Sequence, residues 1–232
     1  MCGRFTMTSS DQRRLGNRFQ ISIEDQQSDA LGRYNVAPTQ EILTATNDPE
    51  GDGARQATLA RWGLVPHWAK DLKAGYKMIN ARSEGVLKSR AYGPLVKKSR
   101  NRCLILADGF FEWMKAEKPK SPRQPVRFTV DGGEPFVFAG LTTTREWEGD
   151  ELTSCTIITT SANEVVEQVH NRMPVILPDS EAEAAWMSGD LEAEEAVSLC
   201  VPLEPGRLSA KPANPALNKV GGTKEGPELL EA

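Results

Sequence analysis

Short runs of apolar residues, many of them alternating with polar ones, recur through the middle of the chain and predict β-strands. The clearest are Gln56–Val65, Arg102–Met114 and Leu152–Thr160. The second run carries an Asp-Gly pair at positions 108 and 109, where we expect the strand to break. Val126–Leu141 holds two further apolar runs on either side of an Asp-Gly-Gly turn, a pattern typical of a β-hairpin.

Helical spacing of apolar residues is confined to short segments late in the chain. Asn163–His170 places valines at helical spacing, Ser180–Trp186 opens with a capping-box sequence, and Leu191–Leu199 is a third candidate. Asn47–Arg55 is a turn-rich loop, and the Gly- and Pro-rich tail from Pro202 is expected to be mostly irregular. Several strands with few helices predict an α+β fold built on curved antiparallel β-sheets.

The composition is that of a soluble globular protein. Of the 232 residues, 39% are hydrophobic and 26% charged, so a core can form without disulfides or metal. The chain has no secretory segment and no apolar run long enough to span a bilayer, so we expect a cytoplasmic protein with reduced thiols. Four cysteines without a CxxC pair, and only two histidines, argue against a zinc site, and no cofactor is expected. Cys103 and Cys155 lie in apolar runs and should be core residues.

The net charge of −4 means that any contact with nucleic acid must come from a local basic patch. Lys88–Arg102 carries six basic residues and no acidic one, whereas Glu181–Glu195 carries many carboxylates and no Lys or Arg. This asymmetry fits a basic face with an acidic back. It fits equally well two solvated surface segments of opposite sign.

The second position offers the most informative chemistry. A small residue there normally allows Met1 to be removed, which would leave Cys2 with an α-amine and a thiol on neighbouring carbons. The α-amine has a pKa of about 7.7–8, so part of it is nucleophilic at neutral pH. It can form a Schiff base with an aldehyde, and the thiol can then close the imine into a thiazolidine. From its position alone, however, Cys2 is better interpreted as an ordinary cysteine near the start of a strand.

Glu112 lies in an apolar strand, where alternation puts Phe111 and Trp113 on one face and the carboxyl on the other. A carboxyl among aromatic rings tends to have a raised pKa, which suits proton transfer near neutral pH. The alternative is a glutamate on the solvent face of an edge strand.

Three further polar residues are candidates for a site. His170 ends an expected helix and can act as an acid or a base near pH 7, although a histidine at that place also suits the helix dipole. Asn80 and Arg82, one residue apart, can orient a sugar and clamp a phosphate. They can equally be a turn residue and a surface arginine. His67 has no evident partner and is interpreted as a loop residue.

Six segments taken in order resemble the SRAP family, which was named for SOS-response-associated peptidases and is regarded as a family of abasic-site crosslinkers. They are MCGRF at the start, GRYNVAP at Gly32–Pro38, WGLVPHWA at Trp62–Ala69, INAR at Ile79–Arg82, ADGFFEW at Ala107–Trp113 and HNRMP at His170–Pro174. The tail at Leu217–Leu230 also resembles the family's C-terminal end. The resemblance implies a single domain over residues 1–232, with a barrel-like core flanked by short helices.

The resemblance also implies roles for individual residues. Cys2 would be the crosslinking nucleophile, Asn80 would orient the opened sugar, and Glu112 would shuttle protons. His170 would help to open the deoxyribose ring to its aldehyde.

A second set of residues falls where the family contacts DNA. Arg4, Arg82 and Arg90 would bind phosphates, Pro38 and Trp68 would stack on or wedge between bases, and Thr159 would lie near the site.

The function implied is a response to DNA damage, in which a monomer binds covalently to abasic sites in single-stranded DNA and shields them from cleavage. The chemistry is that of a lyase-type Schiff base, with removal of Met1 by the protein itself as a further possibility. Two alternatives stay open. A thiol peptidase would also use Cys2, and a non-catalytic reader of single-stranded or modified DNA would need the arginines and Trp68 but not the α-amine.

Overall fold

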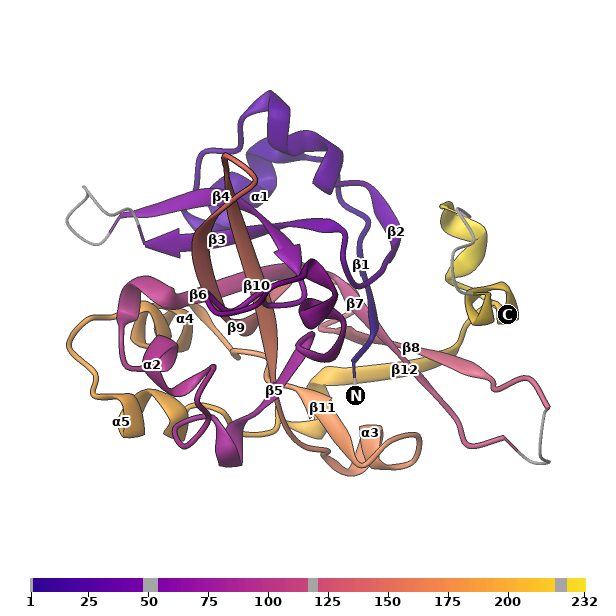
Figure 1. Cartoon of the computed structure of the whole chain (residues 1–232). Helices are drawn as coiled ribbons and strands as arrows, with labels where there is room; N and C mark the ends of the chain where they lie inside the picture. The colour runs from indigo at the N-terminus through magenta and orange to yellow at the C-terminus, as the bar shows by residue number, and fades with distance from the viewer. Residues whose placement is uncertain (1, 48–53, 117–120, 220–224) are drawn as a thin grey trace.

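The computed structural model describes residues 2–47, 54–116, 121–219 and 225–232. Strands occupy the centre of the molecule and short helices surround them (Figure 1). The strands are β1 (Arg4–Met7), β2 (Arg33–Val36), β3 (Glu41–Asn47), β4 (Arg55–Trp62), β5 (Asn80–Arg82), β6 (Arg102–Ala107), β7 (Gly109–Trp113), β8 (Pro125–Val130), β9 (Phe136–Trp147), β10 (Asp150–Ser161), β11 (Arg172–Pro174) and β12 (Leu208–Pro212).

One sheet closes on itself. Its strands run in the order β11-β10-β4-β3-β6-β9, and β9 also pairs with β10, so that β10, β4, β3, β6 and β9 form a closed barrel. Most pairs are antiparallel, as expected, but β10 runs parallel to both β4 and β5, which makes the barrel mixed. The predicted α+β class with a barrel-like core is confirmed.

The second sheet is open, antiparallel throughout, and has the order β12-β8-β7-β1-β2. The N-terminal strand β1 is therefore held on both edges, by β2 and by β7. Its register places Phe5 opposite Phe110 and Thr6 opposite Gly109. This arrangement brings the start of the chain into the interior of the fold instead of leaving it at a free end.

The helices are short. They are α1 (Gln12–Phe19), α2 (Gly93–Val96), α3 (Glu164–Glu167), α4 (Ser180–Met187) and α5 (Ala193–Ser198), with 3-10 turns η1 (Asp25–Ala30), η2 (Leu72–Lys77), η3 (Ser83–Gly85), η4 (Ser99–Asn101), η5 (Pro205–Arg207), η6 (Pro215–Asn218) and η7 (Pro227–Leu229). None of the helices in the described part of the chain has both the length and the apolar character that crossing a bilayer requires.

All three expected late helices exist, but the capping box at Ser180 is wrong. Asp179 caps α4 instead, since its carboxylate accepts a hydrogen bond from the Ala182 backbone N–H over 2.9 Å. Glu183, expected to complete the box, is fully buried and forms ion pairs with Arg18 and Arg55. Those two long-range partners, which sequence spacing does not reveal, draw the carboxylate away from the helix start.

The long apolar run from Arg102 breaks where the Asp-Gly pair predicted, and its two halves enter different sheets. Asp108 accepts hydrogen bonds from the Thr6 hydroxyl and from the Thr8 hydroxyl and backbone N–H, each over 2.6 Å. A Cβ atom at Gly109 would lie 2.8 Å from both the Thr6 hydroxyl and the Arg127 Nε, so the close packing requires glycine. The buried Asp108 thus anchors the far end of β1.

The hairpin predicted over Val126–Leu141 is wrong, because β8 and β9 lie in different sheets. Both edges of β8 are occupied by β7 and β12, and the turn after it is tied to the tail by an ion pair between Asp131 and Arg207. The true long hairpin joins β9 to β10. The tail contributes one strand, β12, and its other described residues form short 3-10 turns and irregular segments, so the expectation of a mostly irregular tail is confirmed apart from this strand. Most of the predicted loop at residues 47–55 lies outside the described residues.

The segments of opposite charge do not lie on opposite faces. The short helix α2 of the basic segment packs against α5, and η4 packs against α4. Arg102 is buried with its guanidinium 5.9 Å from the ring centre of Trp186, and it donates a hydrogen bond to the Ser188 carbonyl over 2.9 Å. The two segments are neighbours, so the proposed basic face with an acidic back is wrong.

Two large buried clusters fill most of the interior, and a smaller one lies around Phe111. One packs the helices α1, α4 and α5 against the barrel, and the other lies between the barrel and the open sheet. Cys103 and Cys155 belong to the second cluster and are fully buried, which confirms their assignment to the core. Cys2 belongs to the same cluster.

Candidate active site

Cys2 lies just before β1, in the apolar cluster between the two sheets, and none of its surface is exposed. The Phe5 ring packs edge-on against Trp62, with ring centres 5.2 Å apart, and fixes the strand beside it. The Cys2 thiol lies 3.6 Å from the backbone carbonyl of Arg4. Burial raises the pKa of the Cys2 thiol well above its usual value, and the charge of Glu112 raises it further. The thiol is therefore protonated at neutral pH.

Asn80 is brought to Cys2 by the pairing of β5 with β10. Its side-chain Nδ2 donates a hydrogen bond to the Cys2 carbonyl over 2.7 Å. Its Oδ1 is buried and has no hydrogen-bond partner within the described part of the chain. The amide thus holds the backbone of Cys2 with its nitrogen, while its oxygen is an unused hydrogen-bond acceptor.

Glu112 is on β7 with only 3% of its surface exposed. Phe111 and Trp113 pack into a separate cluster, so the predicted alternation of faces is confirmed and the solvent-exposed alternative is wrong. Burial raises the pKa of the Glu112 carboxyl, while the charge of His170 opposes that rise. Glu112 is therefore within electrostatic range of both Cys2 and His170.

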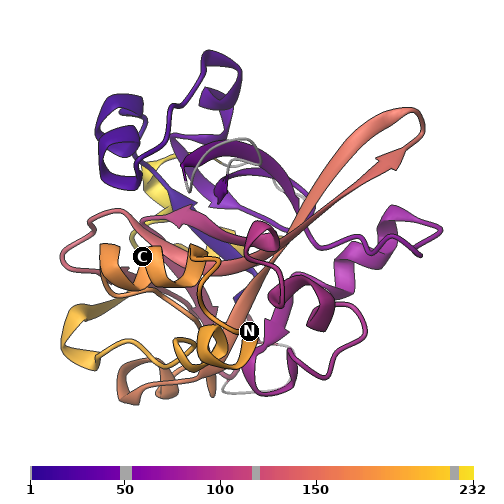
Figure 2. The same ribbon diagram turned by 90° about the vertical axis from the view of Figure 1, so that its left-hand side faces the viewer.

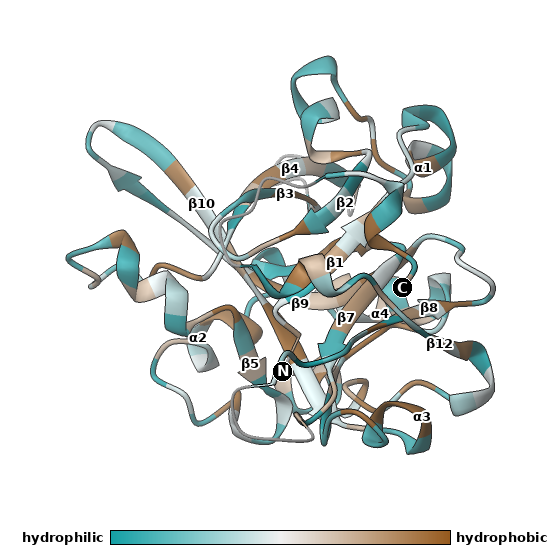
Figure 3. Ribbon diagram, turned by 90° about the vertical axis from the view of Figure 1, so that its right-hand side faces the viewer, coloured by the Kyte–Doolittle hydropathy of each residue, from teal (hydrophilic) through white to brown (hydrophobic). Residues whose placement is uncertain are grey.

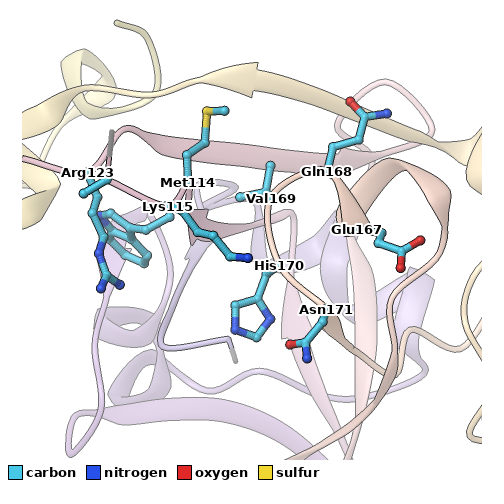
Figure 4. A pocket seen from close by; sticks show the side chains of 10 residues that line it. Met114, Lys115, Arg123, Glu167, Gln168, Val169, His170 and Asn171 are labelled. Atoms are coloured by element: carbon cyan, nitrogen blue, oxygen red, sulfur yellow. The ribbon is translucent and has the colours of Figure 1, made fainter. Parts of the chain in front are cut away.

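His170 follows α3, in the turn that leads into β11. Its ring Nδ1 lies 3.0 Å from the backbone N and 3.2 Å from the carbonyl oxygen of Arg172, which fixes the orientation of the imidazole. The ring lines a cavity of about 920 Å³ between the end of β7 and Glu167–Asn171. Lys115 and Arg123 add positive charge to the wall, and Figure 4 shows the Lys115 side chain extending toward the His170 ring.

Arg172 is a supporting residue that the sequence reasoning missed, although it lies within the quoted HNRMP segment. Its Nη2 donates to the Thr159 carbonyl over 2.6 Å and reaches Glu84 Oε2 over 3.0 Å. Because its backbone also contacts the His170 ring, Arg172 ties β10, η3 and the histidine together. Lys115 and Arg123 were missed as well, since isolated basic residues near a loop give no sequence signal.

The six residues assigned to DNA binding occupy two kinds of environment. Thr159 is fully buried and Arg4 is 8% exposed. Arg4 donates a hydrogen bond to Asn35 Oδ1 over 2.7 Å, and burial lowers the pKa of its guanidinium. Both side chains therefore lie in the protein interior. Pro38 is half-buried in the turn between β2 and β3.

Arg82, Arg90 and Trp68 lie on the surface. The Arg90 guanidinium covers the Trp68 ring at 5.0 Å from its centre, and 40% of Trp68 is exposed. The structure thus joins two of the predicted contact residues in one cation–π pair. Asn80 and Glu112 lie close to Cys2, and His170 lies within electrostatic range of Glu112, while these three are outside the buried site. Among the described residues, no group of three or more His, Cys, Asp or Glu side chains is placed to hold a metal ion.

Similar solved structures support the fold. A protein from Bacteroides thetaiotaomicron superposes with a TM-score of 0.82 over 100% of both chains, at 23% sequence identity. A protein from Bordetella bronchiseptica superposes with a TM-score of 0.74 over 92% of this chain and 100% of that chain, at 25% identity.

Sequence relatives are more informative. The chain is 40% identical to the abasic site processing protein YoqW of Bacillus subtilis over 237 residues, which cover 100% of both chains. It is 32% identical to the abasic site processing protein YedK of Escherichia coli, over 100% of this chain and 99% of that protein. The family model for SOS response associated peptidases matches residues 1–220. This chain therefore belongs to the SRAP family.

Proposed function

We propose that this protein processes abasic sites in single-stranded DNA by forming a covalent crosslink through the α-amine and thiol of Cys2. The observation that carries the proposal is the hydrogen bond from Asn80 to the Cys2 carbonyl, inside a buried site that also holds Glu112 and His170. The names of the relatives YoqW and YedK, both abasic site processing proteins, support it.

The reaction balances with the loss of one water. After removal of Met1, the α-amine of Cys2 adds to the aldehyde carbon of the opened sugar and gives a carbinolamine. Loss of hydroxide together with a proton, as water, leaves an imine. The thiol then adds across the C=N bond, its sulfur bonding to the carbon and its proton going to the nitrogen, and the five-membered thiazolidine results.

The raised pKa of the Cys2 thiol supports this order of steps, because a protonated thiol is a weak nucleophile and leaves the first attack to the amine. Burial raises the pKa of the Glu112 carboxyl and so favours its protonated form, which can give a proton to the departing hydroxyl and relay the thiol proton to the nitrogen during closure. Asn80 Oδ1 would accept a hydrogen bond from a sugar hydroxyl. His170, which lines the cavity beside the end of β7, would move the proton that opens the sugar ring.

The surface residues supply the binding energy for the strand. Arg82 and Arg90 are assigned to backbone phosphates and Trp68 to a base next to the lesion. Arg4 and Thr159, buried beneath them, contribute positive potential and support for Arg172. In this proposal Pro38 borders the strand from the turn after β2.

A thiol peptidase is the less favoured use of the same residue. Such enzymes attack with a thiolate, whose pKa is lowered by a neighbouring cation or helix N-terminus. Here burial in apolar surroundings and the charge of Glu112 shift the pKa of the Cys2 thiol in the opposite direction. A reader of DNA without chemistry would have no use for three polar residues, Asn80, Glu112 and His170, grouped near a buried cysteine.

The decisive experiment mixes the protein with single-stranded DNA that contains one abasic site and separates the products on a denaturing gel. We expect a band that survives heat without borohydride, with the mass of the protein lacking Met1 plus the DNA less one water. Cys200→Ala is a matched control, because Cys200 is buried away from the Cys2 cluster. Purely noncovalent complexes with fresh abasic DNA would contradict the proposal.

A further inference from the structure

The side chain of Arg172 crosses the end of β10. Thr159 on β10 is paired with Pro174 of β11 on one side and with Arg82 of β5 on the other. From β11, the Arg172 guanidinium donates to the Thr159 carbonyl over 2.6 Å and then forms two hydrogen bonds with the carboxylate of Glu84. Glu84 lies in η3, the turn that follows β5. Figure 3 shows β5 and α3, the helix before β11, at the same end of the molecule as the chain start.

The contact between Arg172 and Glu84 has a defined geometry. A guanidinium and a carboxylate that share two hydrogen bonds are fixed in relative orientation, which a single charge contact does not achieve. These bonds hold the pKa of the Glu84 carboxyl below its usual value, so the carboxylate is ionised at neutral pH. The Arg172 side chain is 13% exposed and the Glu84 side chain 57%. A surface carboxylate therefore anchors a largely buried arginine.

The backbone of Arg172 offers the His170 ring a partner in either protonation state. The Arg172 N–H lies 3.0 Å from Nδ1 of the ring and can donate to it when Nδ1 carries no proton. The Arg172 carbonyl oxygen lies 3.2 Å from the same nitrogen and can accept from it when Nδ1 is protonated. An imidazole that gains and loses a proton is thus held by one residue throughout.

The position of Arg172 depends on its side chain more than on its strand. Arg172 is the first of the three residues of β11, and strand ends open more easily than strand centres. Figure 2 shows the β9–β10 hairpin projecting from the molecule, and the contact with Thr159 lies at the opposite end of β10. The hydrogen bonds to Thr159 and Glu84 therefore supply the anchor that the short strand lacks.

We propose that Glu84 is a positioning residue for His170 and acts through Arg172. The carboxylate fixes the Arg172 side chain against η3, and the Arg172 backbone holds the imidazole in the orientation that opening of the sugar ring requires. Because η3 directly follows the strand that carries Asn80, the same contact also fixes the two sides of the site relative to each other. The inference rests on the proposed function and adds a residue to its machinery.

The alternative role for Glu84 is that of an ordinary surface ion pair. Exposed ion pairs contribute little to folding stability, and their removal leaves a distant reaction unchanged. A positioning role predicts a different result, in which the reaction slows while the melting temperature hardly changes. The rate and the stability of the same variants therefore distinguish the two roles.

Crosslinking should be measured in single turnovers with two DNA strands. One carries an intact abasic site, and the other carries an aldehyde that is already open. The variants are Glu84→Ala and Glu84→Gln, of which the second keeps one hydrogen-bond acceptor for Arg172. Asp131→Asn is the matched control, because Asp131 forms a comparable surface ion pair with Arg207 in the turn after β8.

We expect Glu84→Ala to slow crosslinking to the intact abasic site by about 3- to 10-fold, a size typical of residues coupled in one hydrogen-bond network. Glu84→Gln should be slowed less. Neither variant should be slowed on the open aldehyde, and Asp131→Asn should be slowed on neither strand. An unchanged rate of Glu84→Ala on the intact site, or an equal loss on both strands, would overturn the positioning role.

A double-mutant cycle tests whether Glu84 acts through His170. If it does, Glu84→Ala should cause no further loss in a protein that already carries His170→Ala. If the double variant instead loses the full factor of both single variants, the two residues act independently and the inference is wrong.

The ring nitrogens of His170 give a readout that does not depend on crosslinking. The chain has two histidines, so His170→Ala identifies the His170 signals in nitrogen-15 NMR spectra. Glu84→Ala should shift these signals, and Asp131→Asn should not. If no crosslink forms with abasic DNA, yet the His170 signals shift, the restraint on His170 stands and the Cys2 chemistry is wrong. If crosslinks form normally and Glu84→Ala changes neither the rate nor the signals, the Cys2 chemistry stands and the role of Glu84 is wrong.

Discussion

The side-chain amide of Asn80 donates a hydrogen bond to the backbone carbonyl of Cys2 over 2.7 Å, and so links β5 to the start of the chain. Asn80→Ala removes both this bond and the free acceptor Oδ1, so we expect crosslink formation to slow by at least tenfold. The loss of stability should be small, about 0.5–1.5 kcal/mol, as for an ordinary hydrogen bond.

A matched control tests whether that effect is local. Asn101 makes a comparable bond, from Nδ2 to the Thr142 carbonyl over 3.1 Å. Asn101→Ala should cost similar stability in thermal melts and leave the rate of crosslinking unchanged. If both variants lose activity in proportion to their melting temperatures, Asn80 has only a structural role.

The two groups of Cys2 can be separated by substitution. Cys2→Ser keeps the α-amine but closes the ring poorly, so its adduct should require borohydride to survive a denaturing gel. Cys2→Ala should give only a reversible imine, with strand cleavage by β-elimination. A residue placed before Cys2 that cannot be removed should abolish the heat-stable band, and full crosslinking by that extended protein would exclude the α-amine as nucleophile.

We expect Glu112 to lower the folding stability of the protein at neutral pH while it supports the crosslinking reaction. Its pKa is raised in the folded protein, so the folded state binds this proton more tightly than the unfolded state. The stability it contributes is present at pH values below the unfolded pKa and is lost as the pH rises through the folded pKa. Glu112→Gln should therefore melt at a higher temperature relative to the unmodified protein at pH 7 than at pH 4.

The same substitution removes the proton shuttle, so formation and reversal of the crosslink should both slow, by about 10²- to 10⁴-fold. Single-turnover rates on gels, started from abasic DNA and from preformed adduct, measure both directions. An effect below tenfold on each would reduce Glu112 to a structural role.

His170 is expected to act before Cys2 does. His170→Ala should slow crosslinking to intact abasic DNA, whose sugar is mostly closed, by about tenfold or more. The substitution should slow crosslinking far less on a strand that carries an already open aldehyde on a linker. Equal slowing on both substrates would place His170 at the carbon–nitrogen step instead.

The acidic chain should show a shallow salt dependence. With about three phosphate contacts, the slope of log K against log salt is expected near −2 on single strands. Arg82→Ala should weaken binding and reduce the slope by about 0.7, one contact's worth. Trp68→Ala should cost about 1–3 kcal/mol of binding with little change in slope. A slope of about −6 or steeper would reveal a far larger basic surface.

Local patterns predicted much of the fold. The apolar runs located most of the barrel strands, and the Asp-Gly pair located the break at Asp108, because strand propensity and turn chemistry act over a few residues. Pairing could not be predicted the same way. The strands β8 and β9 are adjacent in sequence yet belong to different sheets, since tail strand β12 occupies one edge of β8.

The candidate site, like the fold, could be predicted from the sequence only in part. Cys2, Asn80, Glu112 and His170 were identified by motif resemblance, and alternation along β7 correctly gave the face of Glu112. The burial of Arg4 and Thr159 was not foreseen, nor was the bridging role of Arg172. Each of these features depends on a partner that is distant in sequence, and one amino-acid sequence alone does not indicate such a partner.

The central position of β1 has a mechanical consequence. A DNA strand joined at Cys2 would be tethered to a strand that is paired on both edges and anchored at its far end by Asp108, and not to a fraying terminus. Central strands open only at a free-energy cost close to that of global unfolding. A motor protein that translocates along the DNA and meets the adduct would have to unfold the open sheet before it could pull out the N-terminal strand. The lifetime of the folded adduct on the DNA would therefore depend on the unfolding rate of this sheet.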